Sequence, residues 1–319
     1  MRRAIIRGGN LVVESWPPGD PLSAFSDTAM RLAWAGGSWA HPWTRRGVAG
    51  RLPDPWHRAA GHPARHANLL RRKGTPDVPA EKIALITGAN KGIGFEIARQ
   101  LGEQGSVVLV GARDEVRGKQ SADSLAGRGI AAVPLRIDVT DAASVADAAT
   151  EIERRYGRLD ILVNNAGIAG GFTGVPSEAT ADDMREVYET NVFGVVSVTN
   201  AMLPLLRRSD AGRIVNMSSH VGSLTLNSDP GSPFAGLNLI AYQSSKTALN
   251  AITIAYAKQL RGTPIKVNAA LPGVVATNIN HHRGQRTPAE GAVVAVRLAL
   301  LDDAGPSGAC LSEDGVIPW

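Results

Sequence analysis

The sequence is poor in the residues that build disulfides, cysteine metal sites and aromatic cores. Its single cysteine, Cys310, excludes an intramolecular disulfide and a cysteine zinc site, and is expected to be a small buried apolar residue. Aromatic residues make up 5% of the chain, so its core must come mainly from Ala, Val, Leu and Ile. No apolar run approaches the roughly 18 residues of a membrane span. We therefore expect no membrane partner, and a cytoplasmic main body.

The net charge of the chain is +5, but the excess of basic residues is confined to residues 1–80. Residues 1–80 hold 12 Lys and Arg against 5 Asp and Glu, whereas the remainder holds 22 basic and 24 acidic residues. A strongly basic face is the usual electrostatic signature of nucleic-acid binding. No nucleic-acid partner is therefore expected for the larger part of the chain.

Residues 1–80 differ in composition from the rest and lack a sustained helical or alternating period. They are rich in Pro, Gly and Arg and contain five of the six tryptophans. Three interpretations remain open: a disordered extension, a targeting segment, or upstream sequence included by a misplaced start. The composition favours the first or third, although the tryptophans and arginines would also suit a separate binding module.

Beyond residue 80, six short apolar runs alternate with longer stretches of helical spacing. The runs cover residues 83–86, 107–110, 133–137, 161–163, 213–217 and 265–271. Such alternation predicts βαβ units, and continuous Val/Ile/Leu runs are typical of parallel strands buried on both faces. Residues 81–319 are therefore predicted to form one α/β domain, a doubly wound parallel sheet of Rossmann type with helices on both faces.

A glycine-rich turn, TGANKGIG at residues 87–94, joins the first predicted strand to the first helix. Glycines let the backbone turn tightly and approach a phosphate, and the following helix N-terminus favours an anion. A loop that hydrolyses nucleoside triphosphates would need Gly-Lys-Ser/Thr where this chain has Gly-Ile-Gly. The turn therefore predicts dinucleotide binding through Gly88, Asn90, Lys91, Gly92, Ile93 and Gly94.

The end of the second predicted strand indicates which dinucleotide is bound. An acidic residue there favours NAD, whereas a nearby Arg accommodates the 2′-phosphate of NADP. Arg113 occupies this position and Lys91 adds a second positive charge, while Asp114 weakens the argument. The sequence predicts NADP(H), with NAD(H) as the less favoured cofactor.

Tyr242 and Lys246 lie four residues apart on a predicted helix, so both face the same side. A tyrosine with its ordinary pKa of about 10 is a poor acid–base group at neutral pH. A neighbouring ammonium would lower that pKa toward the working range. A tyrosine and a lysine at this spacing are usually an ordinary pair on a helix surface. Here, however, polar residues or glycine also follow four of the predicted strands, which favours a functional site. Strand ends of this kind are where open α/β sheets bind ligands.

The full set of motifs resembles the short-chain dehydrogenase/reductase family, and within it the NADPH-dependent carbonyl reductases. The matching residues are Thr87-Gly88-x-x-x-Gly92-Ile93-Gly94, Asn164-Asn165-Ala166-Gly167, Asn191, Ser219, Tyr242-x-x-x-Lys246 and Pro272-Gly273. The resemblance covers residues 81–319. It implies an oxidoreductase that moves hydride between NADP(H) and a small-molecule carbonyl or alcohol, without a metal.

The resemblance also implies roles for individual residues. Tyr242 would be the general acid/base and Ser219 would hydrogen-bond the substrate oxygen. Lys246 would lower the tyrosine pKa and bind the nicotinamide ribose, and Asn191 would hold a water in the proton relay. The further cofactor-binding residues would be Asp138 and Val139 near the adenine, Asn165, Ala166 and Gly167 along the cleft, and Gly273, Val275 and Thr277 near the nicotinamide.

Two alternatives to this function remain: an NAD-dependent alcohol dehydrogenase of the same family, and a cofactor-binding sensor that has lost catalysis. A sensor should lack one of Ser219, Tyr242 and Lys246, and all three are present. The family commonly forms dimers or tetramers, which leaves a homo-oligomer open. The substrate and the direction of the reaction are also left open.

The chain is longer between Ser219 and Tyr242 than is common in the family. Residues 224–238 contain Asp-Pro-Gly-Ser-Pro, which predicts a loop over the substrate mouth. That loop could cover the site or be a passive surface insertion. His220 is expected to point away from the chemistry, and His281 and His282 to be exposed loop residues rather than metal ligands.

Overall fold

The computed structural model describes residues 2–7, 10–15, 81–171 and 174–319, and the chain divides into two units at residues 74 and 75. In the first unit, β1 (Arg2–Arg7) pairs antiparallel with β2 (Asn10–Ser15). The sequence had not indicated strands there. The remainder of the predicted extension at residues 1–80 lies outside the described residues.

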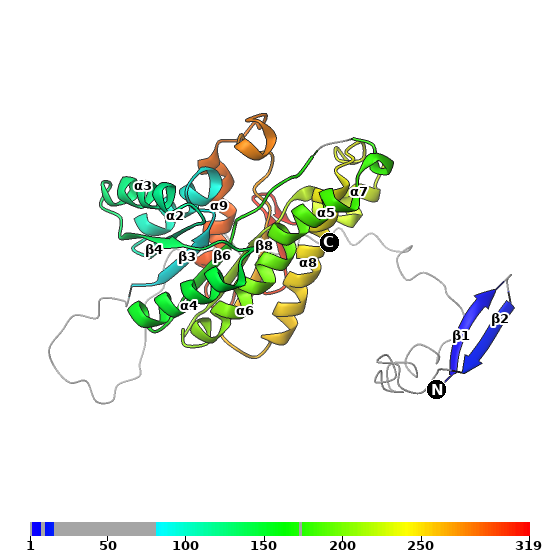
Figure 1. The fold of residues 1–319 in the computed structure, drawn as a ribbon, viewed down its shortest axis with the longest axis horizontal. Coiled ribbons are helices and arrows are strands. Elements are labelled where there is room, and N and C mark those ends of the chain that lie inside the picture. Colours follow the sequence, from blue (N-terminus) through cyan, green and yellow to red (C-terminus); the bar gives the residue numbers. More distant parts are fainter. Residues whose placement is uncertain (1, 8–9, 16–80, 172–173) are drawn as a thin grey trace. The chain divides into compact units, whose positions relative to one another are not determined.

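The second unit is built on an eight-stranded sheet in the order β10-β9-β8-β7-β6-β3-β4-β5 (Figure 1). Its strands are β3 (Ile83–Thr87), β4 (Val107–Ala112), β5 (Ala132–Arg136), β6 (Ile161–Asn164), β7 (Arg213–Met217), β8 (Lys266–Ala270), β9 (Cys310–Ser312) and β10 (Gly315–Val316). All neighbouring pairs are parallel except β9 and β10. The predicted doubly wound sheet and its six strands are confirmed. The sequence analysis missed β9 and β10, whose three and two residues are too few to show a period.

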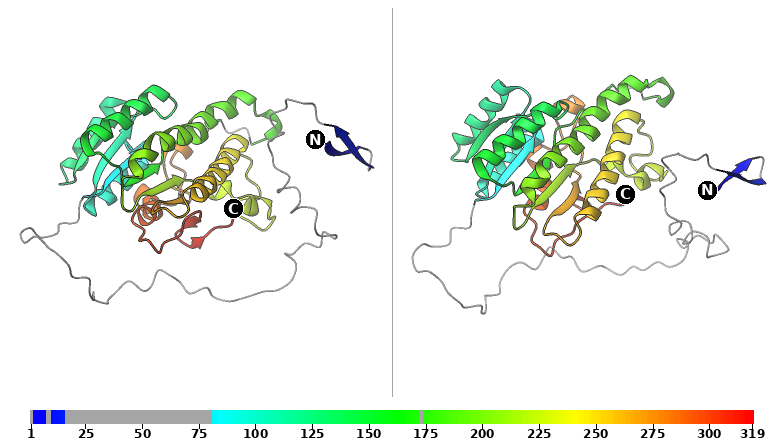
Figure 2. Two further views of the ribbon diagram at one scale, coloured as in Figure 1. Left: turned by 90° about the horizontal axis from the view of Figure 1, so that it is seen from below. Right: turned by 60° about the horizontal axis from the view of Figure 1, so that its bottom comes forward.

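Helices cover both faces of this sheet, as predicted (Figures 1 and 2). One layer contains α2 (Gly92–Glu103), α3 (Glu115–Ala126) and α9 (Pro288–Ala299), and the other contains α4 (Ala142–Tyr156), α6 (Gly194–Leu206) and α8 (Ile240–Gln259). Alternate side chains of β3 enter opposite cores: Ala84 and Ile86 join the first layer, while Ile83 and Leu85 join the second. Burial of each large side chain stabilises the fold by about 1.5–3 kcal/mol.

Shorter elements lie at the carboxyl ends of the strands. The helix α5 (Ala181–Tyr188) runs through a π-turn (Glu189–Phe193) into α6. Short 3₁₀ turns are formed by Pro176–Glu178, His220–Gly222 and Asn278–Asn280. The insertion was predicted to be a loop, but it begins with a short helix, α7 (Leu224–Ser228), capped by Ser223. Among the described residues, every helix is too short or too polar to span a bilayer.

A buried arginine joins β7 to the segment that follows α9. The side chain of Arg213 is 2% exposed and donates to the Leu301 carbonyl at 2.9 and 2.7 Å, and to the Pro264 carbonyl at 3.0 Å. It also pairs with Asp303 at 3.3 Å, but that carboxylate is 85% exposed. The hydrogen bonds to the buried Leu301 carbonyl, rather than the exposed ion pair, should make Arg213 important for stability.

We predict that Arg213→Met lowers the free energy of unfolding by about 2–4 kcal/mol, because the Leu301 and Pro264 carbonyls lose their donors. Urea denaturation measures this change. Asp303→Asn, which removes only the exposed partner, should shift stability by about 0.5 kcal/mol or less. Equal losses in the two variants would contradict this assignment.

Candidate active site

Several predicted site residues converge where the order of the strands along the chain reverses, between the parallel strands β3 and β6. Ligands bind at such switch points in open α/β sheets. A Cβ built on Gly167 would lie 3.2 Å from Asn191 Oδ1 and 3.7 Å from Lys246 Nζ. A Cβ on Gly92 would face Thr277 Cγ2 at 3.7 Å. The glycine turn, the end of β6, the π-turn, α8 and the segment after β8 therefore surround one site.

The glycine turn has the geometry of a phosphate cradle. Gly88 and Gly92 have φ of +66° and +57°, in the left-handed region that favours glycine. A Cβ on Gly94 would lie 2.4 Å from Asn165 Nδ2 and 2.6 Å from the Gly88 carbonyl oxygen, so the helix can approach the turn only without a side chain. These positions fit a backbone that binds pyrophosphate closely.

Asn165 and Thr87 hold this turn in place. Asn165 Nδ2 donates to the Thr87 and Gly88 carbonyls at 2.8 and 3.3 Å. Thr87 Oγ1 accepts from the backbone N–H groups of Asn165 and Ala166, both at 3.0 Å. The carboxamide of Asn165, implied to line the cleft, is therefore engaged with the turn. Thr87 belongs to the glycine-turn motif, but its role in holding the turn was not predicted from the sequence.

Two cations lie at the expected adenosine end of the site. Lys91 and Arg113 are exposed, and within the described part of the chain neither forms an ion pair. Asp114, which had weakened the NADP argument, instead caps α3: it accepts from the Arg117 N–H at 3.0 Å and pairs with the Arg117 side chain at 3.4 Å. This carboxylate is engaged by the helix, which leaves the two cations to dominate the local charge.

Asp138, implied to contact the adenine, is held ionised. Partial burial opposes its ionisation, but hydrogen bonds from the Thr140 N–H and hydroxyl outweigh this effect. The charges of Arg113 and Arg136 act in the same direction, so the pKa of Asp138 lies below its usual value. The carboxylate can therefore accept hydrogen bonds at neutral pH.

The tyrosine and lysine lie on one face of α8, as their spacing predicted. The Ser219 side chain, just beyond β7, lies near enough to the Tyr242 hydroxyl to lower its pKa. Lys246 is 5% exposed, and its Nζ lies 5.5 Å from the Tyr242 ring centroid. The ammonium donates to the Met217 carbonyl at 2.8 Å. Ser219, Tyr242 and Lys246 are thus brought together.

The predicted direction of the tyrosine pKa shift is wrong for this structure. Burial raises the pKa of Tyr242 to about 12, although the hydrogen bond with Ser219 acts in the opposite direction. Burial also lowers the pKa of Lys246 to about 8. The largest cause of the rise at Tyr242 is burial, which removes the phenolate from water. The Lys246 ammonium donates to the Met217 carbonyl. At neutral pH the phenol keeps its proton and Lys246 remains mostly charged.

Asn191 is 1% exposed and lies in the π-turn, an irregularity frequent at functional sites. Its Oδ1 accepts from the Ile168 N–H at 2.9 Å. Its Nδ2 donates to the Ile168 carbonyl at 2.8 Å and to Ser245 Oγ at 3.0 Å. Asn191 therefore joins the segment after β6 to α8. The implied water-binding role stays a prediction, and it cannot use these two N–H groups.

Gly222 and Asn250, which were not predicted from the sequence, hold the segment after Ser219 against α8. A Cβ on Gly222 would lie 2.8 Å from Lys246 Cβ, and the Gly222 carbonyl accepts from Asn250 Nδ2 at 3.1 Å. Asn250 Oδ1 accepts from the Ser218 hydroxyl at 2.6 Å. Asn250 lies four residues beyond Lys246, so extending the helical spacing by one turn could have found it.

Cys310, His281 and His282 are placed as expected, whereas the predicted orientation of His220 stays a prediction. Cys310 is 1% exposed in β9, and burial raises the pKa of its thiol to about 12. His281 and His282 are exposed, with φ of 53° and 60°. His220 stacks on Phe234 of the insertion, with ring centroids 5.6 Å apart.

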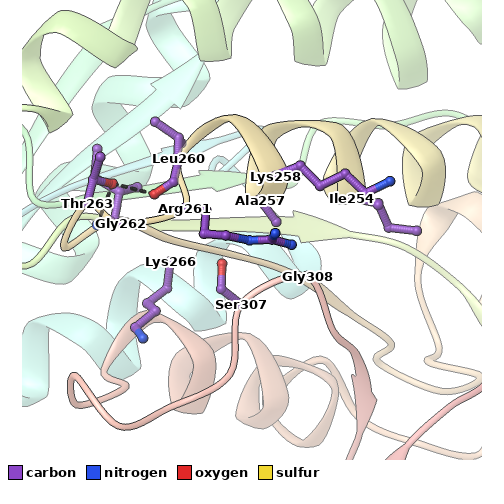
Figure 3. Close-up of a pocket in the computed structure, with 11 residues that line it drawn as sticks. Ile254, Ala257, Lys258, Leu260, Arg261, Gly262, Thr263, Lys266, Ser307 and Gly308 are labelled. Carbon is purple, nitrogen blue, oxygen red and sulfur yellow. Dashed lines mark hydrogen bonds between the residues drawn. The ribbon is translucent and has the colours of Figure 1, made fainter. Parts of the chain in front are cut away.

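A hollow of about 430 Å³ lies at the opposite end of α8 (Figure 3). It is lined by Lys258, Arg261, Lys266 and Ser307, among others, and Figure 3 shows the Lys266 side chain pointing away from those of Lys258 and Arg261. Tyr242 and Lys258 are sixteen residues apart on one helix, or about 24 Å at 1.5 Å per residue. This hollow is therefore separate from the site around Tyr242.

Comparison with known proteins agrees with this geometry. The short chain dehydrogenase family model matches residues 82–288. The chain belongs to the short-chain dehydrogenase/reductase family. It is 36% identical to short-chain dehydrogenase/reductase 1 from Saponaria officinalis in a comparison over 294 residues. The match covers 75% of this chain and 96% of that protein.

Solved structures of this family share the fold. Salutaridine reductase from Papaver somniferum has a TM-score of 0.64 and 32% identity, covering 73% of this chain and 100% of that one. NADPH-bound carbonyl reductase from chicken fatty liver has a TM-score of 0.66 and 29% identity, covering 75% of this chain and 99% of that one. Both likenesses span nearly the whole of the related chain.

Proposed function

We propose that this oxidoreductase is an NADP(H)-dependent carbonyl reductase in which Tyr242 is the general acid. The observation that carries the proposal is the arrangement of Tyr242, Ser219 and Lys246 at one site, with Lys246 Nζ 5.5 Å from the Tyr242 ring centroid and Ser219 near the tyrosine hydroxyl. When bound, the cofactor would supply the hydride that reaches the carbonyl carbon. The protein orients the substrate and supplies the proton to its oxygen.

The raised pKa of Tyr242 suits reduction. A phenol with a pKa of about 12 is fully protonated at neutral pH, so it can hydrogen-bond the substrate oxygen together with Ser219. An alkoxide formed by hydride addition is more basic than a phenolate, so proton transfer from Tyr242 is downhill. The Lys246 ammonium then stabilises the phenolate that is left.

The cofactor assignment rests on charge at the adenosine end. The glycine turn would hold the pyrophosphate, while Lys91 and Arg113 would bind the 2′-phosphate of NADP. Asp114 is engaged in capping α3 and so competes little with this phosphate. The chicken liver carbonyl reductase solved with NADPH supports the same choice. The residues implied for the nicotinamide end are Gly273, Val275 and Thr277.

The rim of the site favours an apolar substrate. Leu224 and Leu237 of the insertion are 64% and 43% exposed, and Val274 and Ile279 after β8 are 54% and 37% exposed. Both segments follow strands whose carboxyl ends lie at the same edge as Tyr242. Large apolar side chains that remain exposed often mark a ligand or partner site. We infer that the insertion forms one wall of the substrate pocket, and that the substrate is an uncharged, largely apolar ketone or aldehyde.

We predict that Tyr242→Phe lowers kcat for NADPH-dependent reduction about 10²–10⁴-fold, because the proton donor is lost. NADPH affinity, measured by fluorescence titration, should change little. Tyr256→Phe is a matched control on the same helix, because its hydroxyl contacts Asn200 at 2.8 Å instead of the site. Full turnover by Tyr242→Phe on a panel of ketones and aldehydes would refute the mechanism.

Replacement of Arg113 by Ala should raise the Kd for NADPH by roughly 10- to 100-fold, which is the value of a hydrogen bond to a charged group. The Kd for NADH should stay nearly constant, since NADH lacks the 2′-phosphate. Arg154→Ala, which removes an exposed arginine paired with Glu151 on α4, is the control. Equal weakening of both cofactors would contradict the NADP assignment.

The pKa of Lys246 predicts how activity depends on pH. Its pKa is lowered to about 8, so the stabilising positive charge is present below this value and lost as the pH rises through it. The kcat/KM for carbonyl reduction, which reports groups of the free enzyme, should therefore fall as the pH rises through about 8. A profile that stays level until the protein unfolds would show that the charge of Lys246 is not needed.

A further inference from the structure

Residues 317–319 are anchored at the β8–β9 end of the sheet. The Ile317 N–H donates to the Cys310 carbonyl at 2.8 Å. The side chains of Ile317 and Trp319 pack against a small buried cluster of Ala269, Leu271 and Cys310. These contacts fix the position of residues 317–319, so that they can support α7.

The element that rests on it is the first turn of α7. Ser223 Oγ donates to the Pro318 carbonyl at 2.6 Å. The backbone N–H and the hydroxyl of Thr225 donate to the Trp319 oxygen at 3.2 and 2.8 Å. Ser223 is 1% exposed, so its hydrogen bond is sheltered from water. Figure 1 shows the C mark beside α8.

The same short helix is joined to the catalytic segment. Asn227 Nδ2 donates to the Val221 carbonyl at 2.7 Å, within the turn that follows Ser219. Asn227 Oδ1 accepts from Gln243 Nε2 at 3.0 Å, and Gln243 is the neighbour of Tyr242. Hydrogen bonds therefore connect residues 317–319 through α7 to Gln243, next to Tyr242, and to Val221, two residues after Ser219.

We propose that residues 317–319 are a positioning element that fixes α7 as a wall of the substrate pocket and so sets the affinity for the carbonyl substrate. The proposal rests on the proposed function, in which the insertion forms that wall. A five-residue helix is far too short to be stable alone. Without its support, α7 must be ordered each time substrate binds, and this entropic cost raises KM.

Thr225→Val tests the proposal, because it keeps the shape of the side chain and removes one donor to Trp319. The KM for an apolar ketone should rise roughly 2- to 10-fold, which is the value of one hydrogen bond. The kcat and the Kd for NADPH should stay the same. Hydrogen exchange should increase in peptides covering residues 219–239 and not in those covering the glycine turn.

Thr150→Val is the matched control, because it is the same substitution at an exposed threonine on α4, whose hydroxyl donates to the Ala146 carbonyl at 3.0 Å. This variant should match the unmodified protein in KM and in exchange. Trp319→Ala, which removes packing against Leu271 and Cys310, should change KM and exchange in the same direction as Thr225→Val.

An unchanged KM and unchanged exchange in Thr225→Val would overturn the proposal. A fall in kcat and NADPH affinity as large as the rise in KM would also overturn it, because it would show general destabilisation. If the unmodified protein reduces no carbonyl, the proposed function fails instead. The exchange measurement needs no substrate, so it still shows whether residues 317–319 order α7.

Discussion

The burial of one ammonium group determines how the rest of the site is arranged. Lys246 lies beneath Tyr242 and is bound to the Met217 carbonyl, in a position that is 5% exposed. To bring α8 this close, the turn after β7 needs glycine at Gly222, where a Cβ would collide with Lys246. The same close contact places Ser219 against the tyrosine hydroxyl. The electrostatic environment and the hydrogen bonding of the site therefore depend on one packing contact.

Burial also explains why the two titrating groups shift as they do. Both the Tyr242 phenolate and the Lys246 ammonium lose water, so each group is pushed toward its neutral form. For a reductase this is favourable at the tyrosine, which must carry a proton to donate it. At the lysine the effect is limited, since a pKa of about 8 still leaves most of the charge at neutral pH.

The sequence was sufficient for features that depend on local pattern. Apolar runs located six parallel strands, and the four-residue spacing placed Tyr242 and Lys246 on one helix face. Features that depend on distant contacts were not predictable in this way. The pKa of Tyr242, for example, depends on burial by several elements. The positions of β9 and α7 depend on partners far along the chain, and neither segment is long enough to show a period.

The central claim is that the free protein holds Tyr242 as a protonated phenol. Titration of the ultraviolet absorbance of phenolate, taken as the difference between the unmodified protein and Tyr242→Phe, measures this directly. The account predicts that Tyr242 titrates well above the ordinary tyrosine range, near a pKa of about 12. A tyrosine that titrates near neutral pH in the free protein would contradict it.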